Sequence, residues 1–325
     1  RRQRQMCIRD SGKIEQIKQI PGVADVVLEQ QYEPAASENT VQPNMEISTG
    51  MTGTTTAWST GYTGAGMRIA IIDTGLDMSH QSFDNGAYEY ALEQNAARAK
   101  ESVEAYKASL DLLDADEINE KLSLLHIKEG VSAADLYRTE KVAYGYCYID
   151  KDLDVTHETD TEGEHGSHVA GIAAANRYLP DGNGGYVSAL DSVHMHGAAP
   201  DAQVLVMKVF GDEGGAYDSD YTAAIEEAIV LGADTINLSL GSASPGPSKA
   251  RTEAYQKIFD DLENASSVVT VSSGNAGYWA KNADPIGYLY SDGVSMQTDG
   301  QPGSYANSLT VASVDNDGFI GNYLL

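Results

Sequence analysis

The chain has 325 residues and is strongly acidic, with 21 Lys and Arg against 48 Asp and Glu and a formal net charge of −27. This charge argues against nucleic acid and anionic membrane surfaces as partners, because both require clustered basic side chains. Apolar residues make up 42% of the chain, enough for a sizeable core, and no apolar run reaches the roughly 20 residues that span a bilayer. Two cysteines, Cys7 and Cys147, cannot form a disulfide framework.

The first 56 residues predict three short segments ahead of the main domain. Residues 1–13 open without Met and without the apolar stretch of a signal peptide, so we expect a non-native or truncated start there. Residues 14–35 predict a short helix, a Pro-Gly turn and a strand at Val23–Leu28. Residues 36–56 are rich in Ser, Thr, Asn and Gly, which is typical of a linker.

Residues 57–325 alternate apolar strands with amphipathic helices. Strands are expected at 68–72, 141–150, 202–210, 234–242, 267–277 and 308–316, and helices at 220–233 and 250–266. This alternation predicts βαβ units, and hence an α/β fold with a mainly parallel central sheet and helices on both faces. Leucines at helical spacing over residues 87–141 predict a helical insertion between two core strands.

Polar residues follow several of the predicted strands. Asp73, Ser239 and Asn275 each stand at the carboxyl end of a strand, where the active sites of parallel sheets collect. Asp73 and Asn275 also lie next to or near glycine, so a simple turn would explain either of them alone.

The stretch EHGSHVAGIAA, residues 164–174, places His165 and His168 three residues apart, on one face of a helix. The two histidines could be metal ligands or packed core residues. Alternatively, one could be a general base at a helix start, with the small residues letting that helix approach a sheet. A carboxylate at Asp73, an imidazole at His165 and an amide at Asn275 would together supply an orienting acid, a base and an oxyanion donor.

Four stretches in order, IAIIDTGLD, HGSHVAGIAA, NLSLGS and VTVSSGNAG, resemble the signatures of the subtilisin-like serine peptidases. The resemblance covers about residues 57–325 and implies the subtilisin-like three-layer fold. It implies that Asp73 orients His165, that His165 is the general base and then the acid, and that Asn275 stabilises the oxyanion. It also implies a set of substrate-binding residues, which pair with the peptide backbone or line the primary specificity pocket: Gly214, Gly215, Ser239, Leu240, Gly241, Ser272, Ser273 and Gly274.

The same resemblance assigns the rest of the histidine stretch. Ser167 stands where the family usually has Thr, and both are small hydroxyl residues. His168 would be a packed structural residue one turn further along the helix. Gly171 and the alanines around it would allow close contact between helix and sheet.

The stretches KVAYGYCYIDKD and IAAAN, with the long helical insertion, resemble the cell-envelope branch of the family, the lactocepin and C5a peptidase-like subtilases. This implies a bacterial serine endopeptidase, extracellular or associated with the cell wall, that acts on polypeptides. Its chemistry would need no cofactor, although structural calcium is compatible with it. Residues 14–35 would be the remnant of an inhibitory propeptide, removed by cleavage in the linker, and residues 57–325 the N-terminal part of the catalytic domain.

The triad serine is missing from this pattern. The family places it in a Gly-Thr-Ser-Met-Ala motif, which does not occur in the chain. The stretch DGVSMQTDG contains Ser295, but it precedes the strand at 308–316 that should come before the nucleophile. We therefore expect the serine to lie beyond Leu325 and the chain by itself to be inactive. A catalytically dead subtilase-like binding module is the alternative.

Metal binding has weaker support. A zinc site could draw on His157, His165, His168, His194, His196 and Glu164, but no His-Glu-x-x-His pattern is present. Calcium could bind the alternating Asp150, Asp152 and Asp154, although these lack an EF-hand frame and a solvated acidic turn is the simpler explanation.

Overall fold

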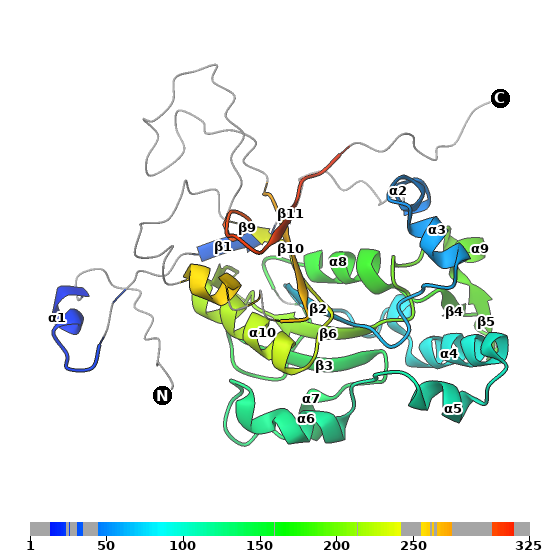
Figure 1. The fold of residues 1–325 in the computed structure, drawn as a ribbon, viewed down its shortest axis with the longest axis horizontal. Helices are drawn as coiled ribbons and strands as arrows, with labels where there is room; N and C mark the ends of the chain where they lie inside the picture. Colours follow the sequence, from blue (N-terminus) through cyan, green and yellow to red (C-terminus); the bar gives the residue numbers. More distant parts are fainter. Residues whose placement is uncertain are drawn as a thin grey trace, which may run out of the picture.

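A six-stranded parallel sheet forms the centre of the chain (Figure 1). The computed structural model describes residues 14–23, 26, 31–34, 45–158, 160–212, 214–241, 255–260, 262, 265–274 and 301–314. The strands are β2 (Arg68–Asp73), β3 (Val142–Cys147), β6 (Gln203–Lys208), β8 (Thr235–Leu238), β10 (Val268–Ser272) and β11 (Leu309–Val311). They lie in the order β11-β10-β8-β2-β6-β3, and each neighbouring pair is parallel, as the sequence predicted.

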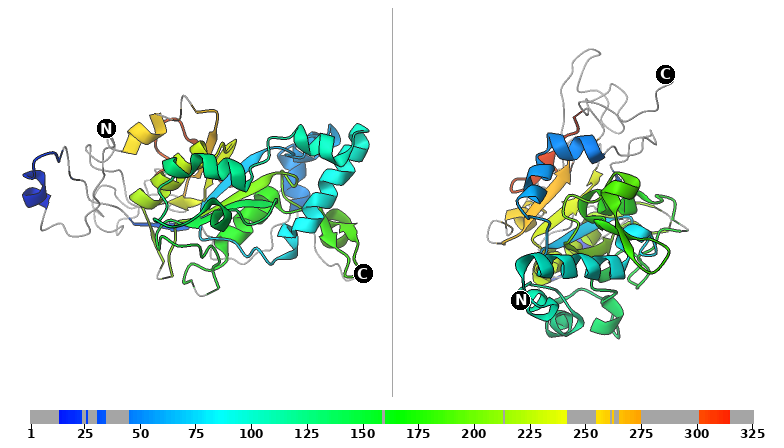
Figure 2. Two further views of the ribbon diagram at one scale, coloured as in Figure 1. Left: turned by 90° about the horizontal axis from the view of Figure 1, so that it is seen from below. Right: turned by 90° about the vertical axis from the view of Figure 1, so that its right-hand side faces the viewer.

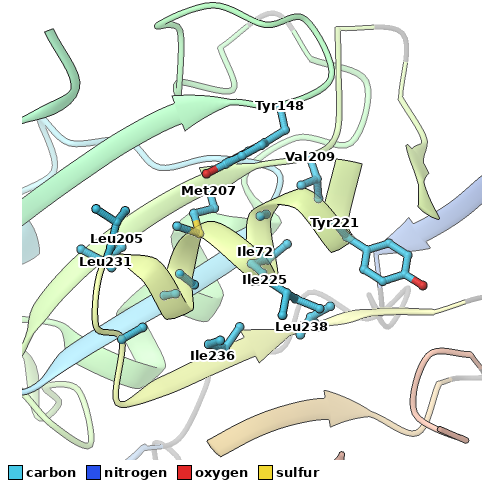
Figure 3. Packing of buried hydrophobic residues seen from close by; sticks show 14 of the residues in the cluster. Ile72, Tyr148, Leu205, Met207, Val209, Tyr221, Ile225, Leu231, Ile236 and Leu238 are labelled. Carbon is cyan, nitrogen blue, oxygen red and sulfur yellow. The ribbon is translucent and has the colours of Figure 1, made fainter. Parts of the chain in front are cut away.

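Side chains on the central strands alternate between two faces, and each face packs against its own helix. The covering helices are α8 (His165–Ala174) and α10 (Asp218–Val230). Ile71 of β2 lies in a buried cluster with Ala170 of α8, whereas the next residue, Ile72, lies in a second cluster with Ile225 of α10 (Figure 3). This period of two is that of a strand buried on both sides. It gives the expected three layers, with α8 above the sheet in Figure 1 and the same fold seen from two further sides in Figure 2.

The segment between β2 and β3 is helical, as predicted for residues 87–141. It contains η2 (Gln81–Phe83), α4 (Asn85–Ala99), α5 (Val103–Ala108), α6 (Ala115–Lys121), η3 (Leu122–Leu124) and α7 (Ala133–Leu136). The buried Arg68 of β2 holds this insertion against the sheet, because its guanidinium lies 2.8 Å from the carboxylates of both Asp111 and Glu117. A hairpin of β4 (Tyr178–Pro180) and β5 (Tyr186–Ser188), followed by α9 (Ala189–Val193), comes after α8. None of the helices in the described ranges is long and apolar enough to cross a membrane.

A second, three-stranded sheet includes a strand from the start of the chain. After α1 (Ile14–Lys18), β1 (Gln31–Pro34) lies between β7 (Ala216–Tyr217) and β9 (Leu240–Gly241) and pairs antiparallel with both. The strand predicted at Val23–Leu28 was wrong in position, since Val23 and Val26, its described residues, are not in a strand. The residues that pair with β1 lie 184 to 208 residues further along the chain, so pairing rather than local β-propensity decides which residues extend.

Residues 45–59 are helical, although composition predicted a linker over 36–56. They form α2 (Met45–Met51) and α3 (Thr54–Ser59). The hydroxyl of Thr49 donates to the Met45 carbonyl at 2.6 Å, so a side chain typical of linkers is satisfied within the helix. Trp58 then anchors α3, because its ring nitrogen donates to the Ala198 carbonyl at 2.8 Å and its ring lies 4.1 Å from that of His196.

We expect mild acid to weaken this anchor. His196 is buried, and burial lowers its pKa below the usual 6.5. The folded protein keeps the ring neutral while the unfolded chain takes up a proton, so this contribution to stability is complete above pH 6.5 and falls as the pH drops below it. His196→Asn keeps an N–H donor but does not titrate. Calorimetry should show a melting temperature that depends less on pH between about 5 and 6.5 in the variant; equal slopes in both proteins would contradict the assignment.

Candidate active site

Asp73 and His165 meet at the carboxyl end of β2. Asp73 is the last residue of β2 and is fully buried, and His165 is the first residue of α8. His165 Nδ1 lies 2.7 Å from Asp73 Oδ1. Because a carboxylate only accepts, Nδ1 is the donor, and this tautomer leaves Nε2 as the basic nitrogen. The His165 side chain is 13% exposed, so it is largely enclosed without being sealed. Three interpretations of the histidines were open from the sequence: metal ligands, packed core residues and a general base. This geometry favours His165 as a general base at a helix start.

Thr74 joins the two elements that carry this pair. Its backbone N–H donates to Asp73 Oδ1 at 2.7 Å, which offsets part of the cost of burying the carboxylate. Its hydroxyl donates to the Gly163 carbonyl at 3.0 Å and accepts from the backbone N–H of Gly166 at 2.8 Å. The end of β2 and the start of α8 are therefore fixed to each other through one side chain.

Glycine at two positions makes this approach possible. A Cβ on Gly166 would lie 2.3 Å from the Gly75 carbonyl oxygen, far inside contact distance. Gly75 has φ +115°, and a Cβ there would lie 2.4 Å from the Val155 carbonyl oxygen. The glycine after His165 thus lets α8 approach the turn that follows β2, and the glycine of Asp-Thr-Gly lets that turn approach the backbone at Val155.

Ser167 makes a second link between α8 and the turn after β2. Its hydroxyl accepts from the Asp77 backbone N–H at 2.8 Å and lies 2.6 Å from His157 Nε2. Hydrogen bonds from the Ser79 hydroxyl, aided by the nearby histidines, lower the pKa of the Asp77 carboxyl. The sequence analysis considered His157 only as a zinc ligand, because nothing local shows that its loop folds back on α8.

Two expectations for α8 were wrong. His168 is exposed rather than packed, because the buried face of the helix runs through Gly166, Ala170 and Ala174, and His168 stands about 200° from Gly166 around the helix. Gly171 is not needed for helix–sheet contact either, since a Cβ there would meet no atom within 4 Å.

The residues expected to bind a substrate strand flank β1. Leu240 and Gly241 form β9 on one side, where Pro34 lies opposite Leu240. Gly214 and Gly215, with φ of +80° and +78°, lead into β7 on the other side. A segment remote in sequence therefore occupies the position of an added strand between the two predicted elements.

Ser239 and the wall of the predicted specificity pocket lie at the same edge. Ser239 directly precedes β9, and its hydroxyl accepts from the Asn237 side chain at 2.9 Å. Ser272 ends β10 and donates to the Leu240 carbonyl at 3.2 Å. Ser273 bonds through its N–H to Val311, and a Cβ on Gly241 would lie 3.8 Å from the Cα of Gly274.

Comparison with known proteins accounts for this combination of sheet, buried pair and strand-binding edge. A profile of the subtilase family matches residues 64–321. The chain belongs to the subtilase family. It is 28% identical over 309 residues to the PII-type proteinase of Lacticaseibacillus paracasei, which is 93% of this chain and 14% of that protein. It is 29% identical over 246 residues to the minor extracellular protease Vpr of Bacillus subtilis, 74% of this chain and 22% of that protein. It is also 28% identical over 261 residues to the C5a peptidase of Streptococcus pyogenes, 78% of this chain and 18% of that protein.

The chain spans only 14% to 22% of the length of these three relatives. Asn275, the expected oxyanion donor of a subtilase, lies outside the described residues, and so does Ser295. The role of Asn275 stays a prediction from the sequence motif, and Ser295 stays rejected as the nucleophile on its position in the sequence.

A buried ion pair beside Asp73 escaped the sequence analysis of this subtilase. Lys208 ends β6 in register with Asp73, and its ammonium lies 2.5 Å from Asp160 and 2.7 Å from the Thr156 carbonyl. Burial lowers the pKa of Lys208, but the hydrogen bond to Asp160 and the nearby negative charges, of which Asp160 is the strongest, together outweigh burial and raise it. The pair fixes the acidic loop that leads into His165. The signal in the sequence that could have revealed this ion pair is a lysine at the end of an apolar strand.

The residues considered as metal ligands are engaged elsewhere or apart. Within the described ranges no three His, Cys, Asp or Glu side chains gather closely enough to hold a metal ion. The Asp152 carboxylate accepts from the Asp154 backbone, and Asp154 accepts from the N–H and hydroxyl of Thr156. These bonds are those of a solvated acidic turn.

Proposed function

We propose that this chain is part of a serine endopeptidase that hydrolyses polypeptides with an Asp-His-Ser triad. The observation that carries the proposal is the 2.7 Å contact between the buried Asp73 carboxylate and His165 Nδ1, at the carboxyl edge of a subtilase sheet. The three relatives described above are named as a proteinase, a protease and a peptidase. We place the nucleophilic serine beyond Leu325, because the chain lacks the motif in which the family carries it.

In this mechanism each residue has one task. The serine oxygen attacks the carbonyl carbon of the peptide bond while His165 Nε2 removes its proton. Asp73 holds His165 in the tautomer with the proton on Nδ1 and stabilises the imidazolium that forms. Asn275 donates its side-chain N–H to the oxyanion of the tetrahedral intermediate. His165 then protonates the leaving amine, and water releases the acyl group by the same steps. No cofactor takes part.

We assign β1 to an inhibitory propeptide, of which residues 14–35 are the last part. The support is the position of β1 between β7 and β9, where a peptide substrate would be added as a strand. Cleavage between Pro34 and Met45 would release this strand and open the edge. Mass spectrometry of the mature N-terminus tests the assignment, since an intact N-terminus on active enzyme would contradict it.

The proposed location is outside the cell, either free or associated with a bacterial cell wall. The name of the minor extracellular protease of Bacillus subtilis supports this. The partners would be polypeptide substrates and the chain's own propeptide.

The test begins with the coding DNA downstream of Leu325. We expect a Gly-Thr-Ser-Met-Ala motif in frame, and we expect the full-length protein to cleave casein and to react with a fluorophosphonate probe. A frame with no such serine, or a full-length protein that neither reacts nor cleaves, would favour the alternative of a catalytically dead subtilase-like binding module.

A further inference from the structure

The side chain of Tyr32, in the middle of β1, is completely buried against α10. Its hydroxyl donates to Asp218 Oδ1 at 2.6 Å, and its ring meets that of Tyr221 edge to face, with centroids 5.2 Å apart. Tyr221 belongs to the same buried cluster as Ile225 and Leu238 and extends from α10 at the side of β1 (Figure 3). The strand is thus held by specific contacts of the Tyr32 side chain in addition to its backbone pairing.

Asp218 is an unusual residue to find at this contact. It is the first residue of α10 and is fully buried, and the Tyr221 hydroxyl also donates to its Oδ1, at 3.1 Å. A buried carboxylate is costly unless hydrogen-bond donors surround it. A phenylalanine in place of Tyr32 would fill the same space and withdraw one donor, so the carboxylate distinguishes the two side chains by the hydroxyl alone.

The backbone contacts of β1 carry no such preference. Gln31 lies opposite Tyr217 and Tyr32 opposite Ala216, while Glu33 lies opposite Gly241. Any extended peptide without a misplaced proline can make these pairings, because they use only N–H and C=O groups. Glycine at position 215 is favoured by its φ of +78°, since the nearest atom to a Cβ there is the end of the flexible Gln31 side chain, which can move aside. Among the side chains of this strand that the structure describes, the fully buried one is Tyr32, so we expect selectivity at the residue opposite Ala216.

We propose that Asp218 and Tyr221 form a tyrosine-selective site for the substrate strand, so that the enzyme prefers peptides with Tyr, rather than Phe or an aliphatic residue, opposite Ala216. Tyr32 occupies this site as the propeptide's own copy of the preferred residue. The inference rests on the proposed peptidase function and names a substrate class for it. Asp218 acts as a specificity residue and takes no part in the bond-breaking chemistry.

The test uses the full-length protein and two quenched fluorescent peptides. One carries the chain's own residues 31–36, Gln-Tyr-Glu-Pro-Ala-Ala, and the other has Phe for Tyr. We expect kcat/KM to be about 10- to 100-fold higher for the Tyr peptide, the range for a hydrogen bond to a charged group. Asp218→Leu should bring the ratio close to one. Asp220→Leu is the matched control, because it removes the same charge from the same helical turn and should keep the ratio.

Casein cleavage and fluorophosphonate labelling are measured on the same samples to separate the two proposals. Casein cleavage with equal kcat/KM for the two peptides in the unmodified enzyme overturns the tyrosine-selective site and leaves the peptidase assignment standing. A Tyr preference that Asp218→Leu leaves unchanged in an enzyme that still cleaves casein also overturns it. If Asp218→Leu fails to fold, the ratio of kcat/KM for the Tyr and Phe peptides in the unmodified enzyme is the deciding result. If the full-length protein is not labelled by the fluorophosphonate and cleaves no substrate, both proposals are overturned.

Discussion

Replacing His165 with alanine in the full-length protein is expected to lower kcat on casein by about 10⁶-fold, the loss that follows removal of a triad histidine. The reason is that Nε2 of His165 would be the base in acylation and the acid in amine release, and Asp73 Oδ1, 2.7 Å from Nδ1, is buried where it can only orient the ring. Asp73→Asn should lower kcat by about 10⁴-fold, since an amide can donate to Nδ1 and so favours the wrong tautomer. Steady-state assays on matched protein concentrations measure both losses.

His168→Ala is the matched control for this prediction. His168 lies on the same helix but is exposed, so its removal should leave casein cleavage within about twofold, as for a surface substitution. A large loss in His168→Ala, or substantial activity in His165→Ala, would show that the wrong imidazole had been assigned. Circular dichroism of each variant establishes that the loss comes from chemistry rather than unfolding.

The fold was predictable wherever local pattern and tertiary environment agree. The apolar runs that became β2 and β6 are buried on both faces, so their composition alone shows that they are strands in a parallel sheet. The helical insertion was predictable because its leucines, which recur at helical spacing, lie on the face by which the helices pack. By contrast, β1 and α3 depend on partners far along the chain, β7 for the first and His196 for the second, and no local pattern encodes these contacts.

The candidate site divides in the same way. Asp73 and His165 were predictable because the carboxyl ends of parallel strands share one edge and His165 opens the next helix. The ion pair of Lys208 with Asp160 and the contact of Ser167 with His157 were not, because loops that fold back leave no periodic signal. For the glycines of α8, sequence indicated that small residues matter but not which one, since that depends on what each Cβ would meet in space.

The two glycines of α8, Gly166 and Gly171, provide the second prediction. Gly166→Ala is expected to destabilise this chain by about 3 kcal/mol, as for an overpacked core. The new Cβ would lie 2.3 Å from the Gly75 carbonyl oxygen and 2.9 Å from its nitrogen, backbone atoms that cannot rotate aside as a side chain can. Relief requires α8 to move away from the turn that carries Asp73, so the His165–Asp73 contact should lengthen. In the full-length enzyme we therefore also expect kcat/KM to fall by about 100-fold.

Gly171→Ala gives the opposite expectation within the same helix. Among the described residues, no atom outside the neighbouring backbone of α8 lies within 4 Å of its Cβ position, and alanine in a helix interior is favoured over glycine by about 0.5–1 kcal/mol. Urea unfolding of the two variants should therefore shift the midpoint in opposite directions. Similar shifts in both would show that helix propensity governs the two positions, and that α8 does not depend on Gly166 for its approach to the end of β2.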